Sequence, residues 1–385
     1  MPRRILIYGN LTASGGISTH VGLLAPLLSE YGNEVTVASL SSDLFDIQGE
    51  RFRRAGLRTI STGLPSSAPA RARRLRALVE WPRQLGRGSF DVVCGFGGGG
   101  FFTFMRAFVA RGGLLVYGES SAGIPDNNRM LNWHALMLRA VDAVLCISPS
   151  AAAALRRNRL RAPIRVLPHM TGIRAPENLP DRQPPGDSGE LRAAYFGRLT
   201  PDKNTEMLLE LWPALRLGPS RLSFYGGGPL LERLRQLVRE KGIGDVVTVH
   251  GPYDREADLA NLMARTALIV LPSQSEGLGL VLLEGMAYGV PFVAGNVGGS
   301  ADLAQYPYGI AVPPDPASLA AAVEAMAHRI RRGLMPAGEI QDAYRRAFSH
   351  EVLAPAWIRA LNDTHSYFGL TASRVAAPSA ASDVI

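Results

Sequence analysis

Residues 271–291, LPSQSEGLGLVLLEGMAYGVP, decide the fold of this chain. The apolar run at 267–271 (ALIVL) that leads into them is short enough to be a buried strand of a parallel sheet. A polar turn and a glycine loop follow, and apolar residues then recur at helical spacing until Gly289–Val290–Pro291 ends the predicted helix. A strand, a glycine loop and a helix N-terminus in this order present free backbone N–H groups to an anion.

Two carboxylates flank this predicted anion site, Glu276 in the loop and Glu284 in the helix. Carboxylates so close to a phosphate would repel it, so we expect them to accept hydrogen bonds from hydroxyl groups instead. The alternative interpretation is an ordinary strand, loop and helix with two surface glutamates.

The stretch from Glu276 to Glu284 resembles the E-x7-E motif of retaining glycosyltransferases of the GT-B fold, family 4. The resemblance implies that Glu276 lies beside the donor sugar, together with the backbone of Gly277, Leu278 and Gly279. It also implies that Glu284 binds the ribose of the nucleotide. The donor would then be a nucleotide-diphosphate sugar, with UDP or GDP as the nucleotide.

Two further segments resemble motifs of the same family. The strand that begins at Leu191 ends in GRLTPDKN, residues 197–204, and resembles the segment G-R-L-x-x-x-K, whose Arg and Lys bind the donor phosphates. Arg198 and Lys203 would therefore stabilise the departing diphosphate without a metal. The alternative is a solvated Arg and Lys in a loop. The segment SFYGGGP resembles the family's G-D-G-P turn, with Gly227 in place of Asp, and implies a further donor contact.

The first half of the chain alternates apolar strands with helical patterns, joined by short loops. This order is typical of a parallel, doubly wound sheet whose ligands bind at the carboxyl ends of the strands. We therefore predict an α/β fold of the GT-B type, with two Rossmann-like doubly wound domains facing across a cleft. The strands expected in the first half are 4–8, 34–40, 91–95, 113–117 and 143–147.

The loop at 9–18 (GNLTASGGIS) is rich in glycine but lacks the G-x-G-x-x-G order of dinucleotide-binding proteins. Gly15 and Gly16, followed by His20, resemble the family's GG-x-x-x-H-V opening, in which the glycines let the backbone approach the donor diphosphate. The alternative is a plain glycine turn, with His20 packed in the first helix.

Two places in the first half depart from the family pattern. A strand that usually ends in a sugar-binding His ends here in VYGES, residues 116–120, with Gly118 at that place. Glu119 follows it, and we hypothesise that its carboxylate orients or deprotonates the acceptor. The alternative is that Glu119 caps the following turn. The family's P-N-G-V-D is replaced by Pro168–His169–Met170–Thr171, a difference that we expect to concern the acceptor.

Length and composition favour more than one domain. At 385 residues the chain is too long for one compact core, and residues 171–189 are rich in Pro and Gly without periodicity, as in a linker. The expected parts are an N-terminal acceptor-binding domain at 1–170, the linker at 171–189, a C-terminal nucleotide-sugar domain at 190–348, a helix at 349–370 that crosses back to the first domain, and a disordered tail at 371–385.

Cysteine usage and apolar patterning argue against several protein classes. The two cysteines lie in separate apolar runs, so a disulfide framework is not indicated and a reducing cytosol fits. The apolar run that follows Arg3 and Arg4 is too short for a signal peptide, and no stretch is long enough to span a membrane. The seven histidines show no metal-ligand spacing, so we expect no metal and no cofactor apart from the substrate itself.

Charge is distributed unevenly along the chain. Residues 1–170 carry 21 arginines, no lysine and 10 acidic residues, a net charge of +11, against −3 for the rest. Clusters at 51–58 (RFRRAGLR) and 71–76 (RARRLR) indicate an anionic partner. We expect the protein to be cytoplasmic. We also expect these clusters to dock its first domain on an anionic acceptor or on the inner face of the membrane. The alternative is a solvated face on an enzyme with a small acceptor. Nucleic-acid binding is not expected, because charge is its only support.

Together these features predict a retaining, metal-independent glycosyltransferase that moves a sugar to a hydroxyl of a glycan, a lipid-linked acceptor or a small molecule. By resemblance, the departing phosphate oxygen takes the acceptor proton, so no protein nucleophile is needed. One alternative is an inactive GT-B protein that binds or regulates. Another is a sugar-nucleotide epimerase of the same fold, for which we identify no catalytic carboxylate pair in the first domain.

Overall fold

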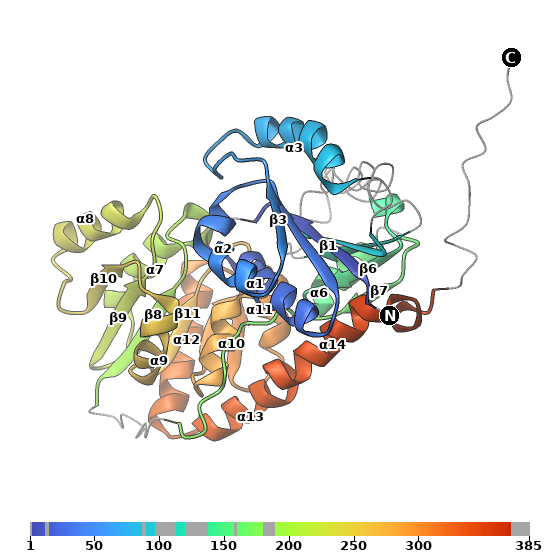
Figure 1. The fold of residues 1–385 in the computed structure, drawn as a ribbon. Coiled ribbons are helices and arrows are strands. Elements are labelled where there is room, and N and C mark those ends of the chain that lie inside the picture. The colour runs from blue at the N-terminus through green and yellow to red at the C-terminus, as the bar shows by residue number, and fades with distance from the viewer. Residues whose placement is uncertain are drawn as a thin grey trace, which may run out of the picture. The chain divides into compact units, whose positions relative to one another are not determined.

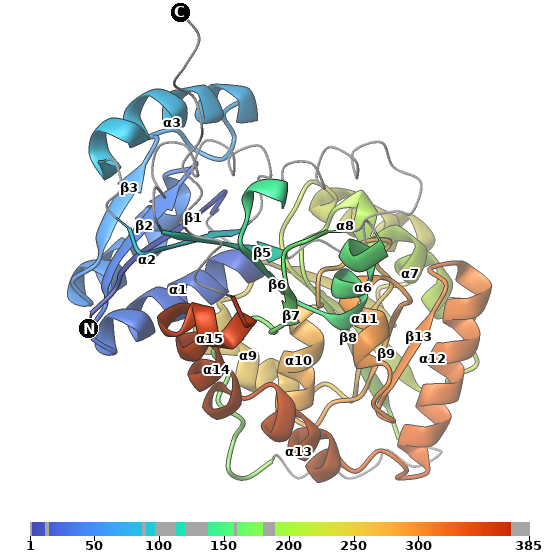
Figure 2. The same ribbon diagram turned by 90° about the vertical axis from the view of Figure 1, so that its right-hand side faces the viewer.

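Figure 1 and Figure 2 show the computed structural model of the chain in two views. The structure describes residues 2–11, 15–86, 90–96, 113–119, 138–157, 160–179 and 189–370. Within these ranges the chain forms two compact units. The first contains residues up to 172 together with 353–370, and the second contains residues 173–352.

The first unit is built on a parallel sheet. Its described strands are β1 (Arg4–Gly9), β2 (Glu34–Ser39), β3 (Arg58–Ser61), β4 (Val92–Phe96), β5 (Leu114–Glu119), β6 (Ala143–Cys146) and β7 (Ile164–Val166). Their order across the sheet is β3-β2-β1-β4-β5-β6-β7. The order reverses between β1 and β4, which is where doubly wound sheets bind ligands at their carboxyl edge.

Helices cover both faces of this sheet. They are α1 (Gly16–Glu30), α2 (Asp43–Arg54), α3 (Ala70–Leu85), α6 (Pro149–Arg157), α14 (His350–Asn362) and α15 (Thr364–Phe368), with a short 3-10 helix at Leu138–Ala140. Side chains of β1 alternate between the faces: Ile5 and Ile7 join a core with α1, α2 and α14, while Leu6 and Tyr8 join another with α3 and α6. Both views show α3 across the sheet from α1 and α14.

Three strands of the first unit run further than the apolar pattern predicts, because they end at Gly9, Phe96 and Glu119. The ladder pairs Gly9 with Phe96, and Phe96 with Gly118. Backbone pairing does not require an apolar side chain, so the end of the apolar run is a poor guide to the end of the strand. Helix α1 begins at Gly16, inside the predicted loop.

The second unit is also built on a parallel sheet. Its described strands are β8 (Leu191–Phe196), β9 (Ser220–Tyr225), β10 (Val247–Gly251), β11 (Leu268–Leu271), β12 (Phe292–Gly295) and β13 (Gly309–Val312), in the order β10-β9-β8-β11-β12-β13. Every residue of β11 and β12 is buried, as the continuous apolar run ALIVL predicts. The strand order reverses between β8 and β11.

The helices of the second unit connect these strands, and after the last strand the chain continues through α12 and α13 into α14. They are α7 (Thr205–Leu211), α8 (Leu231–Lys241), α9 (Arg255–Ala264), α10 (Leu280–Ala287), α11 (Gly298–Leu303), α12 (Pro316–Arg331) and α13 (Ala337–Ala347), with short 3-10 helices at Pro201–Lys203 and Trp212–Ala214. Helix α14 begins in the second unit, and from Leu353 onward its residues belong to the first.

The described part of the predicted linker, residues 171–179 and 189, has no helix or strand, and its residues 173–176 are bound to α13. Tyr344 Oη donates to the carbonyl of Ile173 at 2.9 Å, and Gln341 Nε2 donates to the carbonyl of Pro176 at 2.9 Å. These bonds fasten the beginning of the segment to the second unit. Among the helices of the described ranges, none is long and apolar enough to cross a membrane.

Candidate functional site

The loops after β8 and β11 meet where the strand order of the second sheet reverses. The backbone N–H of Gln274 donates to the carbonyl of Asp202 at 2.8 Å, and Asn204 Nδ2 donates to the carbonyl of Pro272 at 3.1 Å. Asn204 holds a φ of 51°, a conformation that asparagine tolerates better than most residues. Two segments singled out from the sequence therefore come together at the edge where such sheets bind ligands.

Lys203 and Glu276 form a buried ion pair in this loop cluster. Lys203 Nζ lies 2.7 Å from Glu276 Oε1 and donates to the carbonyl of Ser275 at 2.6 Å. Ser273 Oγ donates to the same glutamate oxygen at 2.8 Å. The lysine and glutamate side chains are 11% and 15% exposed, so each charge needs the other. Glu276 Oε2 has no partner among the described residues and is available to a ligand hydroxyl.

Arg198 is exposed just beyond the end of β8. Its carbonyl accepts a hydrogen bond from Tyr195 Oη at 2.7 Å, whereas its guanidinium makes no hydrogen bond or ion pair within the described residues. Burial, together with the nearby charges of Glu276 and Asp202, raises the pKa of Tyr195, so the hydroxyl stays a donor. The loop after β8 thus carries one lysine held in an ion pair and one unengaged arginine.

Glycines let the loop after β9 pack directly on the loop after β8. A Cβ at Gly226 would lie 1.8 Å from the carbonyl oxygen of Gly197, and a Cβ at Gly228 would lie 2.5 Å from that of Leu199. Gly227, between them, is different, because a Cβ there would meet only Pro252 Cγ at 3.2 Å. The packing requires the two outer glycines, whereas a side chain at Gly227 would require only a small shift of the Pro252 ring.

The loop Gly277–Leu278–Gly279 leads into α10 as the sequence predicts. Gly279 lies before the first residue of the helix with a φ of 69°, in the left-handed region. The carbonyl of Gly277 accepts from the N–H of Gly299 at 2.8 Å. The side chain of Leu278 is 3% exposed, so only its backbone could reach a ligand. These three residues therefore offer backbone atoms rather than side chains.

Glu284, on α10, is 4% exposed and is held by Arg255, the first residue of α9. Nε of Arg255 donates to Glu284 Oε1 at 2.8 Å, and its Nη2 contacts the same oxygen. Burying an unpaired carboxylate is costly, and Arg255 offsets that cost. Burial and the charge of Glu284 raise the pKa of Tyr253, which keeps this neighbouring hydroxyl neutral. Arg255 was not predicted from the sequence, because an arginine at the first position of a helix rich in charged residues matches no distinctive motif.

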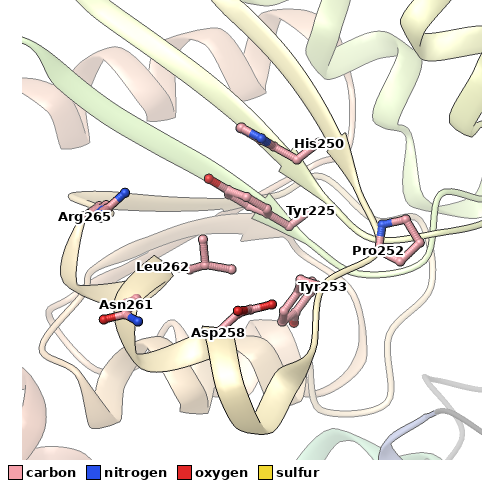
Figure 3. A pocket seen from close by; sticks show the side chains of 8 residues that line it. All are labelled: Tyr225, His250, Pro252, Tyr253, Asp258, Asn261, Leu262 and Arg265. Carbon is pink, nitrogen blue, oxygen red and sulfur yellow. The ribbon is translucent and has the colours of Figure 1, made fainter.

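A pocket of about 330 Å³ opens at the carboxyl ends of β9 and β10 (Figure 3). The rings of Tyr225 and His250 form one wall, stacked with their centroids 4.5 Å apart at an angle of 6°. Burial lowers the pKa of His250 and favours its neutral form. The lining residues are Tyr225, His250, Pro252, Tyr253, Asp258, Asn261, Leu262 and Arg265. This pocket was not predicted from the sequence. The only local indication was an aromatic ring near the end of each of its two strands, Tyr225 in β9 and His250 in β10.

In the first unit, the histidine of the glycine-rich opening lies in a neutral, buried cluster. The ring of His20 stacks on that of His169 with centroids 4.3 Å apart and packs against Phe96 and Trp357. The backbone N–H of Met170 donates to His20 Nδ1 at 3.2 Å. Burial lowers the pKa of His20 well below its usual value, assisted by His169, and lowers the pKa of His169 to about 3. The alternative of a packed His20 therefore describes this side chain.

The remaining predicted residues lie along the carboxyl edge of the first sheet. Gly15, with a φ of 134°, precedes Gly16, the first residue of α1. Gly118 faces the ring of Phe96, because a Cβ there would lie 2.5 Å from it. This close packing is a physical reason for glycine where the family has histidine. Glu119 is the last residue of β5 and pairs with Cys146 in the ladder, so it is part of the strand rather than of the loop beyond it.

Neither unit offers an evident metal centre in its described residues, since no three His, Cys, Asp or Glu side chains lie close enough to hold a metal ion there. Cys94 and Cys146 are buried, and they form no disulfide with each other. The charged groups gathered at the edge of the second sheet are instead cations and carboxylates, which suit a ligand with both phosphate and hydroxyl groups.

Comparison with known families gives matches in both halves of the chain. Residues 190–329 match the family described as "Glycosyl transferases group 1", and residues 14–171 match "Glycosyltransferase Family 4". The first range contains the ion pair Lys203–Glu276 and the pair Arg255–Glu284, and the second contains the buried histidines.

Known proteins resemble parts of the chain. The GDP-mannose-dependent α-(1-6)-phosphatidylinositol monomannoside mannosyltransferase of Mycobacterium tuberculosis is 33% identical over 144 residues, which are 32% of this chain and 37% of that protein. The α-D-kanosaminyltransferase of Streptomyces kanamyceticus is 28% identical over 265 residues, 62% of this chain and 67% of that protein. The matched region thus spans little more than a third of the mycobacterial relative.

Solved structures share the architecture. Sucrose-phosphate synthase from Thermosynechococcus elongatus superposes with a TM-score of 0.77 at 20% identity, and HepE from Anabaena, in complex with UDP and glucose, with 0.71 at 16%. Each comparison covers 94% of this chain and 99% of the other. At such identities the likeness concerns the fold alone, and it confirms the predicted α/β class with two Rossmann-like units.

Proposed function

The chain belongs to the GT-B glycosyltransferases of family 4, and from this we propose that it moves a sugar from a nucleotide-diphosphate sugar to a hydroxyl group. The observation that carries the proposal is the gathering of Arg198, Lys203, Glu276 and Glu284 around the reversal point of the second sheet. Two cations there match a diphosphate, and two carboxylates, each with an oxygen unused by the described residues, match the hydroxyls of ribose and sugar.

The donor diphosphate is assigned to Arg198 and Lys203. The ammonium of Lys203 has its two short bonds to Ser275 and Glu276 and a longer contact of 3.5 Å to Asp202, which a phosphate oxygen could replace. The guanidinium of Arg198 can bind two phosphate oxygens at once. Because the negative charge on the phosphate grows as the sugar leaves, both cations act more strongly in the transition state than in the ground state.

The nucleoside is assigned to Glu284 and the aromatic pocket. Glu284 Oε2 is the oxygen left for the ribose hydroxyls, since Nε and Nη2 of Arg255 both contact Oε1. Tyr253 lies close enough to Glu284 to sense its charge and also lines the pocket (Figure 3). A planar base stacked in this pocket would therefore be attached to a ribose at Glu284. Uracil and guanine both fit this description, in keeping with UDP or GDP.

We infer a retaining transfer in which the departing phosphate oxygen takes the proton of the acceptor hydroxyl. Glu276 is poorly suited to attack the sugar itself, because one of its oxygens binds both Lys203 and Ser273. An ion-paired carboxylate is a weaker nucleophile, but its other oxygen, Oε2, can still accept a hydrogen bond from a sugar hydroxyl. The charge stabilisation that a metal gives to a leaving diphosphate is supplied in this proposal by Arg198 and Lys203, with no further cofactor.

The first unit is assigned to the acceptor, a glycan, a lipid-linked sugar or a small hydroxyl compound. Glu119 remains our candidate for orienting that hydroxyl, or for taking its proton in place of the departing phosphate oxygen. The net charge of +11 on residues 1–170 supports an anionic partner, such as the cytoplasmic face of a membrane. Three of the eight arginines in the two clusters form ion pairs, because Arg53 and Arg54 pair with Glu50 and Arg76 pairs with Glu80.

The deciding experiment has two stages. Thermal unfolding with a panel of nucleotides and sugar nucleotides should single out one nucleoside diphosphate, since a ligand at a hundred times its Kd adds about 2.7 kcal/mol to stability. Turnover of the matching sugar nucleotide with candidate acceptors should follow. Stabilisation without turnover on any acceptor would favour the inactive binding protein, and no stabilisation by any nucleotide would refute the donor site.

A further inference from the structure

Helix α3 exposes a row of apolar side chains that the fold does not use. Ala77, Trp81 and Leu85 on its inner face are buried against the first sheet. On its outer face Leu75, Leu78 and Val79 are 57%, 40% and 58% exposed. They are three of the seven large hydrophobic residues that are exposed among the described residues. Since the inner face already anchors the helix, the outer row needs another explanation.

The outer row is a continuous stripe. At about 100° per residue, Leu75, Leu78 and Val79 fall within a sector of about 100°, and Pro82 and, at the start of the helix, Arg71 project inside it. Arg74 borders the sector on one side, and Arg83 borders it on the other. An apolar centre with a basic border on each side is the pattern of a helix that lies in the plane of a membrane surface.

The arginines that border the stripe, and the one at its N-terminal end, are unengaged. Arg71, Arg74 and Arg83 are exposed and make no ion pair or side-chain hydrogen bond within the described residues. The other two arginines of the helix differ: Arg73 is buried and binds Asn10 and the carbonyl of Ala68, and Arg76 pairs with Glu80, the one acidic residue of α3. The outer face therefore presents free positive charge beside its apolar stripe.

We propose that α3 docks the first unit on an anionic lipid bilayer. Leu75, Leu78 and Val79 enter the boundary between headgroups and acyl chains, while Arg71, Arg74 and Arg83 bind headgroup phosphates. The inference deepens the proposed function, on which it rests for the anionic partner. It narrows that partner to a bilayer, because an anion alone would leave the apolar stripe in water. A second copy is disfavoured, since two such faces repel each other.

Co-sedimentation with lipid vesicles, in the absence of any nucleotide, tests the proposal. The full chain is mixed with vesicles of phosphatidylcholine alone or with added phosphatidylglycerol, at low and high salt. Binding should require phosphatidylglycerol and should weaken as salt screens the charges. Binding to both vesicle types alike, or to neither, would overturn the proposal.

Two sets of variants separate the stripe from its border. Leu75→Gln/Leu78→Gln/Val79→Gln keeps helix propensity and charge, and it should lower the partition coefficient at least about tenfold. Its control is Leu334→Gln/Val352→Gln, at two apolar positions of the second unit that are 58% and 40% exposed, which should bind as the unchanged chain does. If the triple variant bound vesicles as tightly as the unchanged chain, electrostatic attraction alone would explain binding. That result would refute insertion of the apolar stripe.

Arg71→Gln/Arg74→Gln/Arg83→Gln should lower binding about fivefold for each charge removed and should flatten the salt dependence. The matched control, Arg216→Gln/Arg239→Gln/Arg332→Gln, removes the same charge from exposed positions of the second unit and should bind several-fold more tightly than this variant. Equal losses in the two sets would mean that net charge alone acts, contrary to docking through α3. Stabilisation by nucleoside diphosphate, measured on the same samples, reports on the donor site separately.

Discussion

The carboxyl edges of the two sheets carry opposite kinds of chemistry. In the second unit the edge gathers charged side chains in pairs, Lys203 with Glu276 and Arg255 with Glu284. In the first unit the corresponding edge holds the neutral, stacked rings of His20 and His169. Similar parallel sheets with similar glycine-rich loops can therefore carry either a polar ligand site or a packed core at their carboxyl edge. The side chains at that edge decide which of the two is formed.

The largest effect is expected from the charged edge, at Lys203. Lys203→Met should lower turnover about 10²–10³-fold, as does the removal of one donor that stabilises a developing anion. Binding of the bare nucleoside should change much less, because the nucleoside lacks the diphosphate. Steady-state kinetics and calorimetric titration measure the two quantities.

The control for this prediction is Lys241→Met, at a partly exposed lysine 3.5 Å from Glu210, which should leave turnover unchanged. If Lys203→Met weakened nucleoside and nucleoside diphosphate binding equally, Lys203 would hold the loop together and would have no special part in the reaction.

At the edge of the first sheet, Glu119→Gln is the corresponding test. If the Glu119 carboxylate, rather than the departing phosphate oxygen, takes the proton of the acceptor hydroxyl, kcat should fall about 10²-fold while donor affinity stays the same, because the substitution removes the charge and keeps the size. Glu34→Gln, at the exposed start of β2, serves as the control. Unchanged turnover in Glu119→Gln would leave the charged edge of the second unit as the whole of the catalytic site.

Glu284→Ala should raise the Kd for nucleoside diphosphate about tenfold to a hundredfold, the effect of losing charged hydrogen bonds worth about 1.5–3 kcal/mol. Arg255→Met should weaken binding through the same carboxylate, so a double-mutant cycle should show coupling between the two residues. Isothermal titration with each variant gives the cycle. If the losses of binding free energy in the two single variants simply added in the double variant, Arg255 would not act through Glu284. Unchanged affinity in Glu284→Ala would show that Glu284 does not bind the nucleotide.

The smallest effect concerns the neutral edge and is a matter of stability. Because the pKa values of His20 and His169 are lowered in the folded protein, the unfolded chain takes up protons first as the pH falls. The stability that each neutral, buried histidine contributes is fully present above the unfolded pKa of about 6.5 and is lost progressively as the pH falls below that value. A fall from about pH 8 to about pH 5.5 should therefore lower the free energy of unfolding by about 1.4 kcal/mol for each histidine.

Urea unfolding at several pH values measures this loss. His169→Asn lowers stability by removing the ring stack, but its pH dependence should be about 1.4 kcal/mol shallower over the same interval, because one titrating group is gone. Parallel pH profiles for the variant and the unchanged chain would show that the stacked histidines do not control acid sensitivity.

Residues near a strand–loop–helix boundary were predicted well, and residues that depend on distant partners were not. The sequence placed Glu276, Arg198 and Lys203 in loops that follow strands and Glu284 in the helix after the loop, where local periodicity and glycine spacing are informative. It gave no indication that Arg255 holds Glu284, 29 positions along the chain. Such a contact depends on how α9 and α10 pack, and no local pattern encodes it.

The neutral edge illustrates the same limit from the other side. Gly118 was recognised as a departure from the family, but the ring of Phe96 that occupies the space of a Cβ became visible only in the folded unit. His20 was left between two interpretations, and the stack with His169, which lies 149 positions later in the sequence, explains its burial.

The sequence alone therefore determined the class of fold and the family, because strand and helix periods and short motifs are local properties of the chain. The tertiary structure decided which of the named side chains are paired, buried or free. It paired Lys203 with Glu276, left the guanidinium of Arg198 unengaged, and exposed the apolar stripe of α3. The physical reason is that charge pairing and burial depend on contacts between residues far apart in sequence, and only the packed chain brings those residues together.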